Sequence, residues 1–293
     1  MRIGSLFSGI GGLELGLERA GLGRTVWQVE RSAFCRWVLR SHWPGAVQHD
    51  DVRTVGRANL APVDLICGGF PCQDLSSAGK GAGLAGARSG LWYHMERVIN
   101  EIEPGWVVVE NVASGWRRWL PVVRRRLWAL GYAALPLRLR ASDVGARHQR
   151  ARVFVVASTD HARLRLAQRA HLRGDGATQQ PAPPRGGGNA DFADIVCKGL
   201  RREQQPEDGN PRPDGPPVVR PGFGWPAFSP LVRRVYGFPA GLDVPRWRGA
   251  GWSPARLRRA RIHALGNAVV PQCAEAVGRL IFNATAGGRD GCT

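Results

Sequence analysis

The chain has 293 residues, 43% of them hydrophobic, so it is long enough to bury a sizeable core in one or two domains. Its apolar runs are too short to span a membrane, and its 6 cysteines include no C-x-x-C pair, which argues against a zinc site or a disulfide framework. With 41 Lys+Arg against 23 Asp+Glu, the formal net charge of +18 indicates a polyanionic partner such as nucleic acid. We therefore expect a cytoplasmic protein with no bound metal and no membrane partner.

The chain opens with a strand, a glycine turn and a helix. Residues 2–7 are predicted to form the strand, Ser8-Gly9-Ile10-Gly11-Gly12 the turn, and residues 13–20 the helix. This order is typical of sites that hold a nucleotide cofactor. Glu14 replaces the third glycine of the dinucleotide fingerprint, so a standard dinucleotide site is not indicated.

Two acidic residues follow the next predicted strands. Glu30 ends the strand at 26–30, 21 residues after Gly9, where a carboxylate can accept hydrogen bonds from both ribose hydroxyls of an adenosine group. It could equally be an acid that begins a helix. Asp51 follows a third strand, where it could bind an adenine amino group or act as a turn residue.

Cys72 lies in Gly-Gly-Phe-Pro-Cys-Gln, directly after a predicted buried strand at 63–67. Ligands of open α/β sheets bind beyond the carboxyl ends of the strands, so a thiol on this loop is presented to a ligand. The alternative is a buried cysteine that packs as a small hydrophobe, which we expect for Cys67. Residues 76–87 are rich in glycine and predict a mobile loop that could close over a substrate.

The sequence Glu110-Asn111-Val112 ends the next predicted strand, at 106–109. A carboxylate and a nucleophile at neighbouring strand ends can converge on one pocket, although Glu110 could also be a solvated turn acid. Helices are predicted at 91–102 and 116–130, and strands at 132–140 and 153–157. Arg150 and Arg152 lie just before the last of these strands and alternate with their neighbours, so both should point to one side.

Residues 159–226 are rich in Arg, Gly, Pro and Gln with little periodicity, which predicts a loop-built insertion. After it, residues 265–271 turn into a final predicted helix at 272–281.

Taken in order, these motifs resemble the DNA cytosine-C5 methyltransferases over residues 1–282, nearly the whole chain. Phe7 to Gly12 is similar to the family's first cofactor motif, and Glu30 and Asp51 stand where its second and third motifs would lie. The later motifs are matched by residues 69–73, 110–112, 150–152 and 266–269. His148 and Ala151 depart from the family's usual Gln and acid.

The resemblance implies an α/β fold with a doubly wound, mostly parallel sheet and an inserted target recognition domain. The catalytic domain would comprise residues 1–158 completed by 256–287, the recognition domain 159–255, and the tail 288–293. The implied reaction transfers a methyl group from S-adenosylmethionine to C5 of a cytosine flipped out of duplex DNA, through an adduct of Cys72 at C6. We expect a monomer, and the sequence leaves open whether a restriction endonuclease accompanies it.

The resemblance also assigns residues to the two halves of the site. The catalytic residues would be Cys72, Glu110, Arg152, Arg150, Asn111 and Pro71. The cofactor-binding residues would be Phe7, Ser8, Gly9, Ile10, Gly11, Gly12, Leu13, Glu30, Asp51, Val52, Gly69, Leu91, Asn267, Ala268 and Val269.

Other functions remain open at this point. One branch of the same family methylates a tRNA cytosine, although it shows Pro-Pro-Cys where this chain has Pro-Cys-Gln. A DNA-binding module with a decayed site would have no need of Cys72, Glu110 and Arg152. A thiol redox protein is disfavoured because C-x-x-C is missing.

Overall fold

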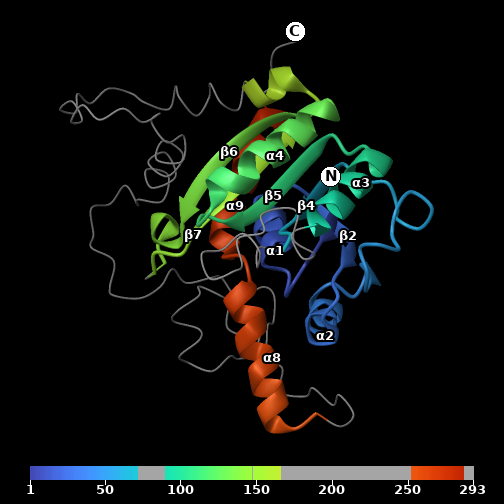
Figure 1. Cartoon of the computed structure of the whole chain (residues 1–293), viewed down its shortest axis with the longest axis vertical. Helices are drawn as coiled ribbons and strands as arrows, with labels where there is room; N and C mark the ends of the chain where they lie inside the picture. Colours follow the sequence, from blue (N-terminus) through green and yellow to red (C-terminus); the bar gives the residue numbers. More distant parts are fainter. Residues whose placement is uncertain (72–89, 147, 166–251, 287–293) are drawn as a thin grey trace, which may run out of the picture.

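The computed structural model describes residues 1–71, 90–146, 148–165 and 252–286 (Figure 1). The strands are β1 (Arg2–Leu6), β2 (Arg24–Val29), β3 (Val47–His49), β4 (Leu65–Gly68), β5 (Trp106–Val112), β6 (Ala133–Arg140) and β7 (Ala151–Ser158). The helices are α1 (Gly12–Arg19), α2 (Ala33–His42), α3 (Leu91–Ile102), α4 (Trp116–Ala129), the 3-10 turn η2 (Ala141–Val144), α8 (Pro254–Asn267) and α9 (Pro271–Ala286).

The strands form one sheet in the order β3-β2-β1-β4-β5-β7-β6. Neighbouring strands from β3 to β5 run parallel, and β7 is antiparallel to both β5 and β6. This confirms the predicted doubly wound, mostly parallel sheet. The strand order reverses between β1 and β4, and the crevice beyond the carboxyl ends of such strands is where open α/β sheets bind ligands. We call this side of the molecule the carboxyl edge.

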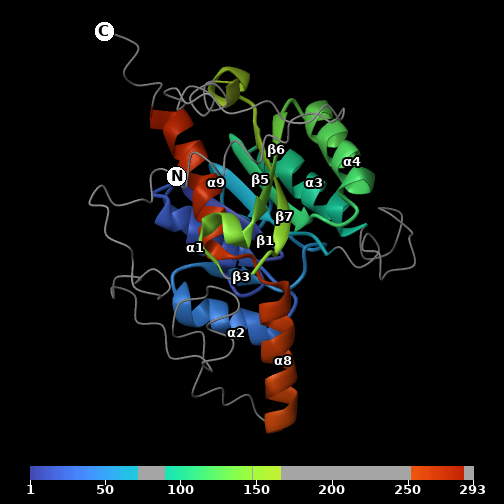
Figure 2. The same cartoon turned by 90° about the vertical axis from the view of Figure 1, so that its left-hand side faces the viewer.

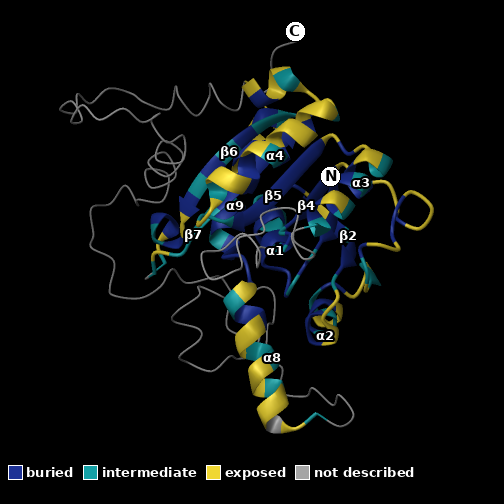
Figure 3. Cartoon of the chain, in the orientation of Figure 1, coloured by how far each residue is buried: buried dark blue, intermediate teal, exposed yellow. Residues whose placement is uncertain are grey.

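Helices cover both faces of the sheet (Figures 1 and 2). The central strands β1, β4 and β5 are largely dark blue in the burial view because their side chains alternate between two apolar layers (Figure 3). In β5, Val108 packs with α1 and α9, while Val107 and Val109 pack with α3 and α4. The functional residues at the carboxyl edge therefore sit on a rigid support.

Most predicted elements are confirmed, with shifts at their ends. The helix at 91–102 has the predicted bounds, and α4 ends one residue early, at Ala129. The prediction that Arg152 precedes the last strand is wrong, because β7 begins at Ala151 and Arg152 pairs with Val112 of β5. Pairing with a neighbouring strand extends β7 beyond its apolar run, and the sequence pattern does not reveal that pairing.

The last helix returns to pack on the first, and two glycines allow the close approach. A Cβ added to Gly12 would lie 2.3 Å from the carbonyl oxygen of Val269, and one added to Gly16 would lie 2.3 Å from that of Pro271. Gly16 would also meet the Cβ of Ala274 at 2.4 Å. The end of the chain thereby completes the carboxyl edge beside β1.

We predict that Gly16→Ala destabilises the protein, although alanine favours a helix over glycine by about 1 kcal/mol. The new methyl group must separate α1 from α9, which costs about 1–3 kcal/mol as overpacking. Urea unfolding measures the difference. The control is Gly45→Ala, whose added Cβ meets nothing within 4 Å. A Gly16→Ala protein more stable than the wild type would contradict the close contact.

Candidate active site

The turn after β1 has a backbone that few side chains tolerate. Gly9 and Gly11 have φ angles of 56° and 83°, in the left-handed region that glycine adopts without steric cost. Phe7 shares this region at φ 56°, which is strained for a residue with a large side chain. Strain of this kind is found at binding sites, where the surrounding structure holds it in place. The turn is therefore a specialised one, at the switch point of the sheet.

Glu30 ties this turn to the end of β2. Its Oε2 accepts the backbone N–H of Gly9 at 2.8 Å, and its Oε1 accepts that of Ser32 at 2.7 Å. Burial raises the pKa of Glu30, and these two N–H donors oppose the rise. Since a carboxylate offers about four lone-pair sites, both oxygens keep acceptor capacity for ligand hydroxyls.

Arg150 ties the C-terminal motif to the same edge. Its Nη2 donates to the carbonyl oxygens of Gly266 at 2.6 Å and Ala268 at 3.1 Å. The next residue, Val269, is the one whose carbonyl oxygen lies against Gly12. The amide of Asn267 is exposed and lies 3.2 Å from the ring Nε2 of His263. Residues separated by more than 250 positions in the sequence thus meet beside the first turn.

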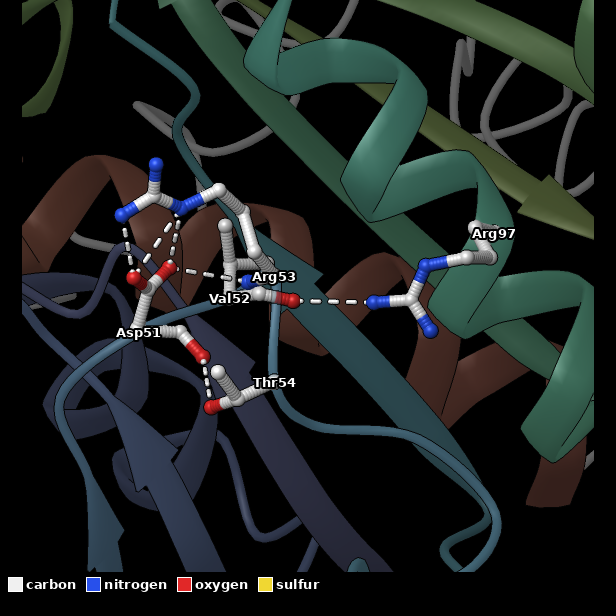
Figure 4. Close-up of polar contacts among 5 residues, drawn as sticks. All are labelled: Asp51, Val52, Arg53, Thr54 and Arg97. Atoms are coloured by element: carbon white, nitrogen blue, oxygen red, sulfur yellow. Dashed lines mark hydrogen bonds and ion pairs between the residues drawn. The ribbon is translucent and has the colours of Figure 1, made fainter.

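Asp51 forms an ion pair with Arg53 in the loop after β3 (Figure 4). The guanidinium and backbone N–H of Arg53 lower the pKa of Asp51 to about 2. Arg97 of α3 fixes this loop by donating to the carbonyl oxygens of Val52 at 2.9 Å and Val55 at 2.8 Å. The structure therefore places Asp51 and Val52 on an anchored loop, with the Asp51 carboxylate already engaged.

A second cluster lies farther along the carboxyl edge. Glu110 of β5 and Arg152 of β7 form an ion pair, with 2.8 Å between Oε1 and Nε, and both side chains are largely buried. A Cβ added to Gly69 would lie 2.8 Å from Oε2 of Glu110, so a side chain there would displace the carboxylate. Burial raises the pKa of Glu110, and the charges of Arg152 and Arg150 oppose that rise.

Asn111 holds the chain just before the predicted nucleophile. Its buried Nδ2 donates to the carbonyl oxygen of Phe70 at 3.1 Å. The ring of Phe70 packs between Trp92 and Trp119, with ring centroids 5.6 Å and 5.9 Å away. Pro71 is half-buried and follows directly. The start of the Cys72 loop is thereby fixed beside Glu110, whereas Cys72 itself lies outside the described residues.

The other cysteines in the described part of the chain are buried. Burial raises the pKa of Cys35 and of Cys273 to about 12, and that of Cys67 well above its usual range. Thiols with such values are poor nucleophiles at neutral pH. The prediction that Cys67 packs as a core residue is confirmed.

The remaining predicted residues have simple positions. Leu91 is half-buried at the start of α3 and packs on the apolar layer of that face. His148 is half-buried, and burial together with Arg150 lowers its pKa. Ala151 pairs with Arg140 in the sheet. Among the described residues, no group of three His, Cys, Asp or Glu side chains could hold a metal, and no helix there is long and apolar enough to cross a membrane.

The sequence motifs do not indicate the positions of two residues near the first turn. Trp43 has its ring where a Gly11 side chain would be, 2.3 Å from the added Cβ, and its Nε1 donates to Glu18. Glu14 is fully buried, and its Oε1 accepts the side-chain amide of Gln28 at 3.5 Å. Burial raises the pKa of Glu14 to about 7. The one sequence signal for Glu14 is an acid in place of a fingerprint glycine.

A sheet in the order β3-β2-β1-β4-β5-β7-β6, parallel except for its antiparallel β7, is the fold of S-adenosylmethionine-dependent methyltransferases. A crystal structure of a DNA modification methyltransferase encoded within an E. coli prophage shares this fold, with a TM-score of 0.62 and 18% identity over 98% of this chain and 99% of that one. The model of the family "C-5 cytosine-specific DNA methylase" matches residues 1–182. The chain belongs to this family.

Curated relatives match the chain in part. The type II methyltransferase M2.BsuMI of Bacillus subtilis is 36% identical over 166 residues, which are 54% of this chain and 42% of that protein. The type II methyltransferase M.PspPI of Psychrobacter is 40% identical over 136 residues, covering 44% of this chain and 32% of that protein. The aligned segments therefore span less than half the length of either relative.

We predict that the buried Glu14 makes stability depend on pH. Its pKa of about 7 in the folded state lies above the unfolded value of 4.5, so folding takes up a proton. The resulting stabilisation is complete below about pH 4.5 and is lost as the pH rises through about 7. Glutamine does not titrate, so Glu14→Gln should not show this loss. From pH 5 to pH 8, the free energy of unfolding of the wild type should fall by about 2–3 kcal/mol more than that of Glu14→Gln.

Urea unfolding at both pH values measures the effect. The control is Glu103→Gln, the same substitution at a side chain that is 74% exposed, and we expect no comparable gain. Parallel pH profiles for wild type and Glu14→Gln would show that Glu14 is ionised alike in both states.

Proposed function

We propose that the chain transfers a methyl group from S-adenosylmethionine to C5 of a cytosine in duplex DNA. The observation that carries the proposal is the buried Glu110–Arg152 pair above Gly69, next to the anchored start of the Cys72 loop. A carboxyl group and a guanidinium fixed at 2.8 Å match the donors and acceptors along one side of a cytosine ring. The whole site stands at the carboxyl edge, a short distance along the sheet from the first turn.

The residues of the first turn suit S-adenosylmethionine. Glu30 has acceptor capacity left for the two ribose hydroxyls, and the turn from Phe7 to Leu13 lets a ligand approach its backbone closely. Val52, on the loop that Arg97 anchors, would lie near the adenine. Asn267, Ala268 and Val269 would complete the site from the C-terminal side. When bound, S-adenosylmethionine supplies an electrophilic methyl group.

The side chains of this chain would activate the cytosine. The Cys72 thiolate would add to C6, which places a nucleophilic electron pair on C5 for the methyl group. Loss of the C5 proton to solvent would then expel the thiolate and restore the C5–C6 double bond. Because its pKa is raised, Glu110 can share a proton with ring N3 as negative charge develops there. Arg152 would bind the ring O2, and its positive charge would favour the thiolate.

Arg150, Asn111 and Pro71 would position these groups. Arg150 joins the start of β7 to the C-terminal motif, so it links the cytosine pocket to the cofactor site. Asn111 fixes the carbonyl of Phe70, and Pro71 restricts the backbone immediately before the nucleophile.

Duplex DNA is the proposed partner. The net charge of +18 suits a polyanion, and the relatives are named type II methyltransferases. The target base would leave the helix at a cost of a few kcal/mol. We propose residues 159–255 as the segment that recognises the sequence, inserted into a catalytic domain made of 1–158 and 256–287, and a monomer as the active form.

The test is a transfer assay with labelled S-adenosylmethionine and mixed-sequence duplex DNA, followed by bisulfite sequencing. Methylation of cytosines in one short context would support the proposal and give the recognition site. A parallel reaction contains tRNA. Transfer to tRNA alone, or tight DNA binding without any transfer, would overturn the proposal in favour of an RNA enzyme or a decayed binding module.

We predict that Cys72→Ser abolishes transfer and leaves duplex binding within about twofold, because a hydroxyl is far less ionised than a thiol at neutral pH. Transfer rates and a DNA-binding isotherm measure both effects. Cys292→Ser is the matched control, the same substitution in the predicted tail. Wild-type turnover by Cys72→Ser would remove this thiol from the mechanism.

A further inference from the structure

Helix α8 is amphipathic, and one of its faces holds it to the body of the protein. Leu257, Ala260, Ala264 and Leu265 pack against the apolar cluster that includes Phe34 of α2. The spacing of three and four residues places them on one side of the helix. This packing therefore determines which way the opposite side of α8 faces.

The opposite side is exposed along the whole helix. Its residues are Ala255, Arg258, Arg259, Ile262 and His263, and they recur at the same spacing of three and four. This face is largely yellow in Figure 3. We call it the α8 outer face.

The charge of α8 has one sign. Residues 254–267 contain four arginines and neither Asp nor Glu. Arg256 stacks on Trp252, with its guanidinium carbon 4.2 Å from the ring centroid, and Arg261 is half-buried, where burial lowers its pKa. Within the described part of the chain, Arg258 and Arg259 have no ion-pair partner, so their charge is directed to solvent.

The position of α8 places this charge beside the carboxyl edge. Its C-terminal end is held at the carboxyl edge by the Arg150 hydrogen bonds to Gly266 and Ala268. From there the helix projects away from the sheet for roughly 21 Å, at 1.5 Å per residue, as Figures 1 and 2 both show. The α8 outer face leads directly to Asn267, at the cofactor motif.

We propose that the α8 outer face binds the phosphate backbone of duplex DNA beside the cytosine site, with Arg258 and Arg259 as the contacts. The inference rests on the proposed function, since it concerns the same substrate. Among the residues that the structure describes, this cationic face has no ion-pair partner and carries no acid, which suits a polyanion. Ile262 is the only large apolar residue of the α8 outer face, which disfavours an apolar protein partner. Contacts of this kind set the position of DNA and are independent of its sequence.

The test compares two double variants of the full chain. Arg258→Ala with Arg259→Ala removes two charges from α8, and Arg124→Ala with Arg125→Ala removes two exposed charges from α4. The α4 pair is a matched control because α4 runs from the carboxyl edge to the opposite edge, where β6 begins. Dissociation constants for a duplex of mixed sequence are measured at several salt concentrations, and thermal unfolding confirms that each variant folds.

We expect the α8 double variant to bind roughly tenfold or more weakly near 0.1 M salt. The slope of log K against log salt should fall in magnitude by about 2, since each phosphate contact contributes about 0.9. The α4 variant should keep the wild-type slope. Arg258→Lys with Arg259→Lys should restore most of the slope, because a cation remains at both positions.

A wild-type slope in the α8 variant, or an equal loss in the α4 variant, would overturn the inference. The outcome is separable from the proposed function. Wild-type protein that methylates DNA together with an unaffected α8 variant would refute the DNA-binding face alone. Loss of the salt slope in a chain that transfers no methyl group would support the face and refute the reaction.

Discussion

The site depends on the close contact of the first and last helices. Gly12 and Gly16 let α9 approach α1, and this contact carries the C-terminal motif to the turn after β1. Arg150 secures the same junction through the carbonyl oxygens of Gly266 and Ala268. Segments that are far apart in the sequence therefore form one continuous carboxyl edge. Larger residues at the two glycines would separate the C-terminal motif from the turn after β1.

The two halves of the edge each contain a carboxylate whose pKa is raised by burial, and they use it in different ways. Glu30 accepts two backbone N–H groups and so shapes the turn, whereas Glu110 is paired with a buried arginine and has a raised pKa. Desolvation penalises the charged form in both, and the local donors determine how far. A third carboxyl, Glu14, is fully buried, so its raised pKa affects stability and has no direct part in the proposed chemistry.

The sequence alone determined the architecture and most of the edge. Apolar runs and glycine turns predicted the parallel strands and the helix at 91–102, because periodicity and backbone freedom are local properties. The order of short motifs placed Glu30 beside Gly9 and Glu110 beside the residues that precede Cys72. Residues at successive strand ends must meet on one edge of a parallel sheet, so their position in the chain was sufficient.

Only the tertiary structure decided which partner each polar group takes. Arg150 binds the C-terminal motif while Arg152 binds Glu110, although the two arginines look equivalent in the sequence. Asp51 is engaged by its neighbour Arg53, and Glu14 is buried where a glycine was expected. The α8 outer face is exposed because the other face of the helix packs on α2. Burial and pairing depend on contacts between distant segments, and a local pattern carries no record of those contacts.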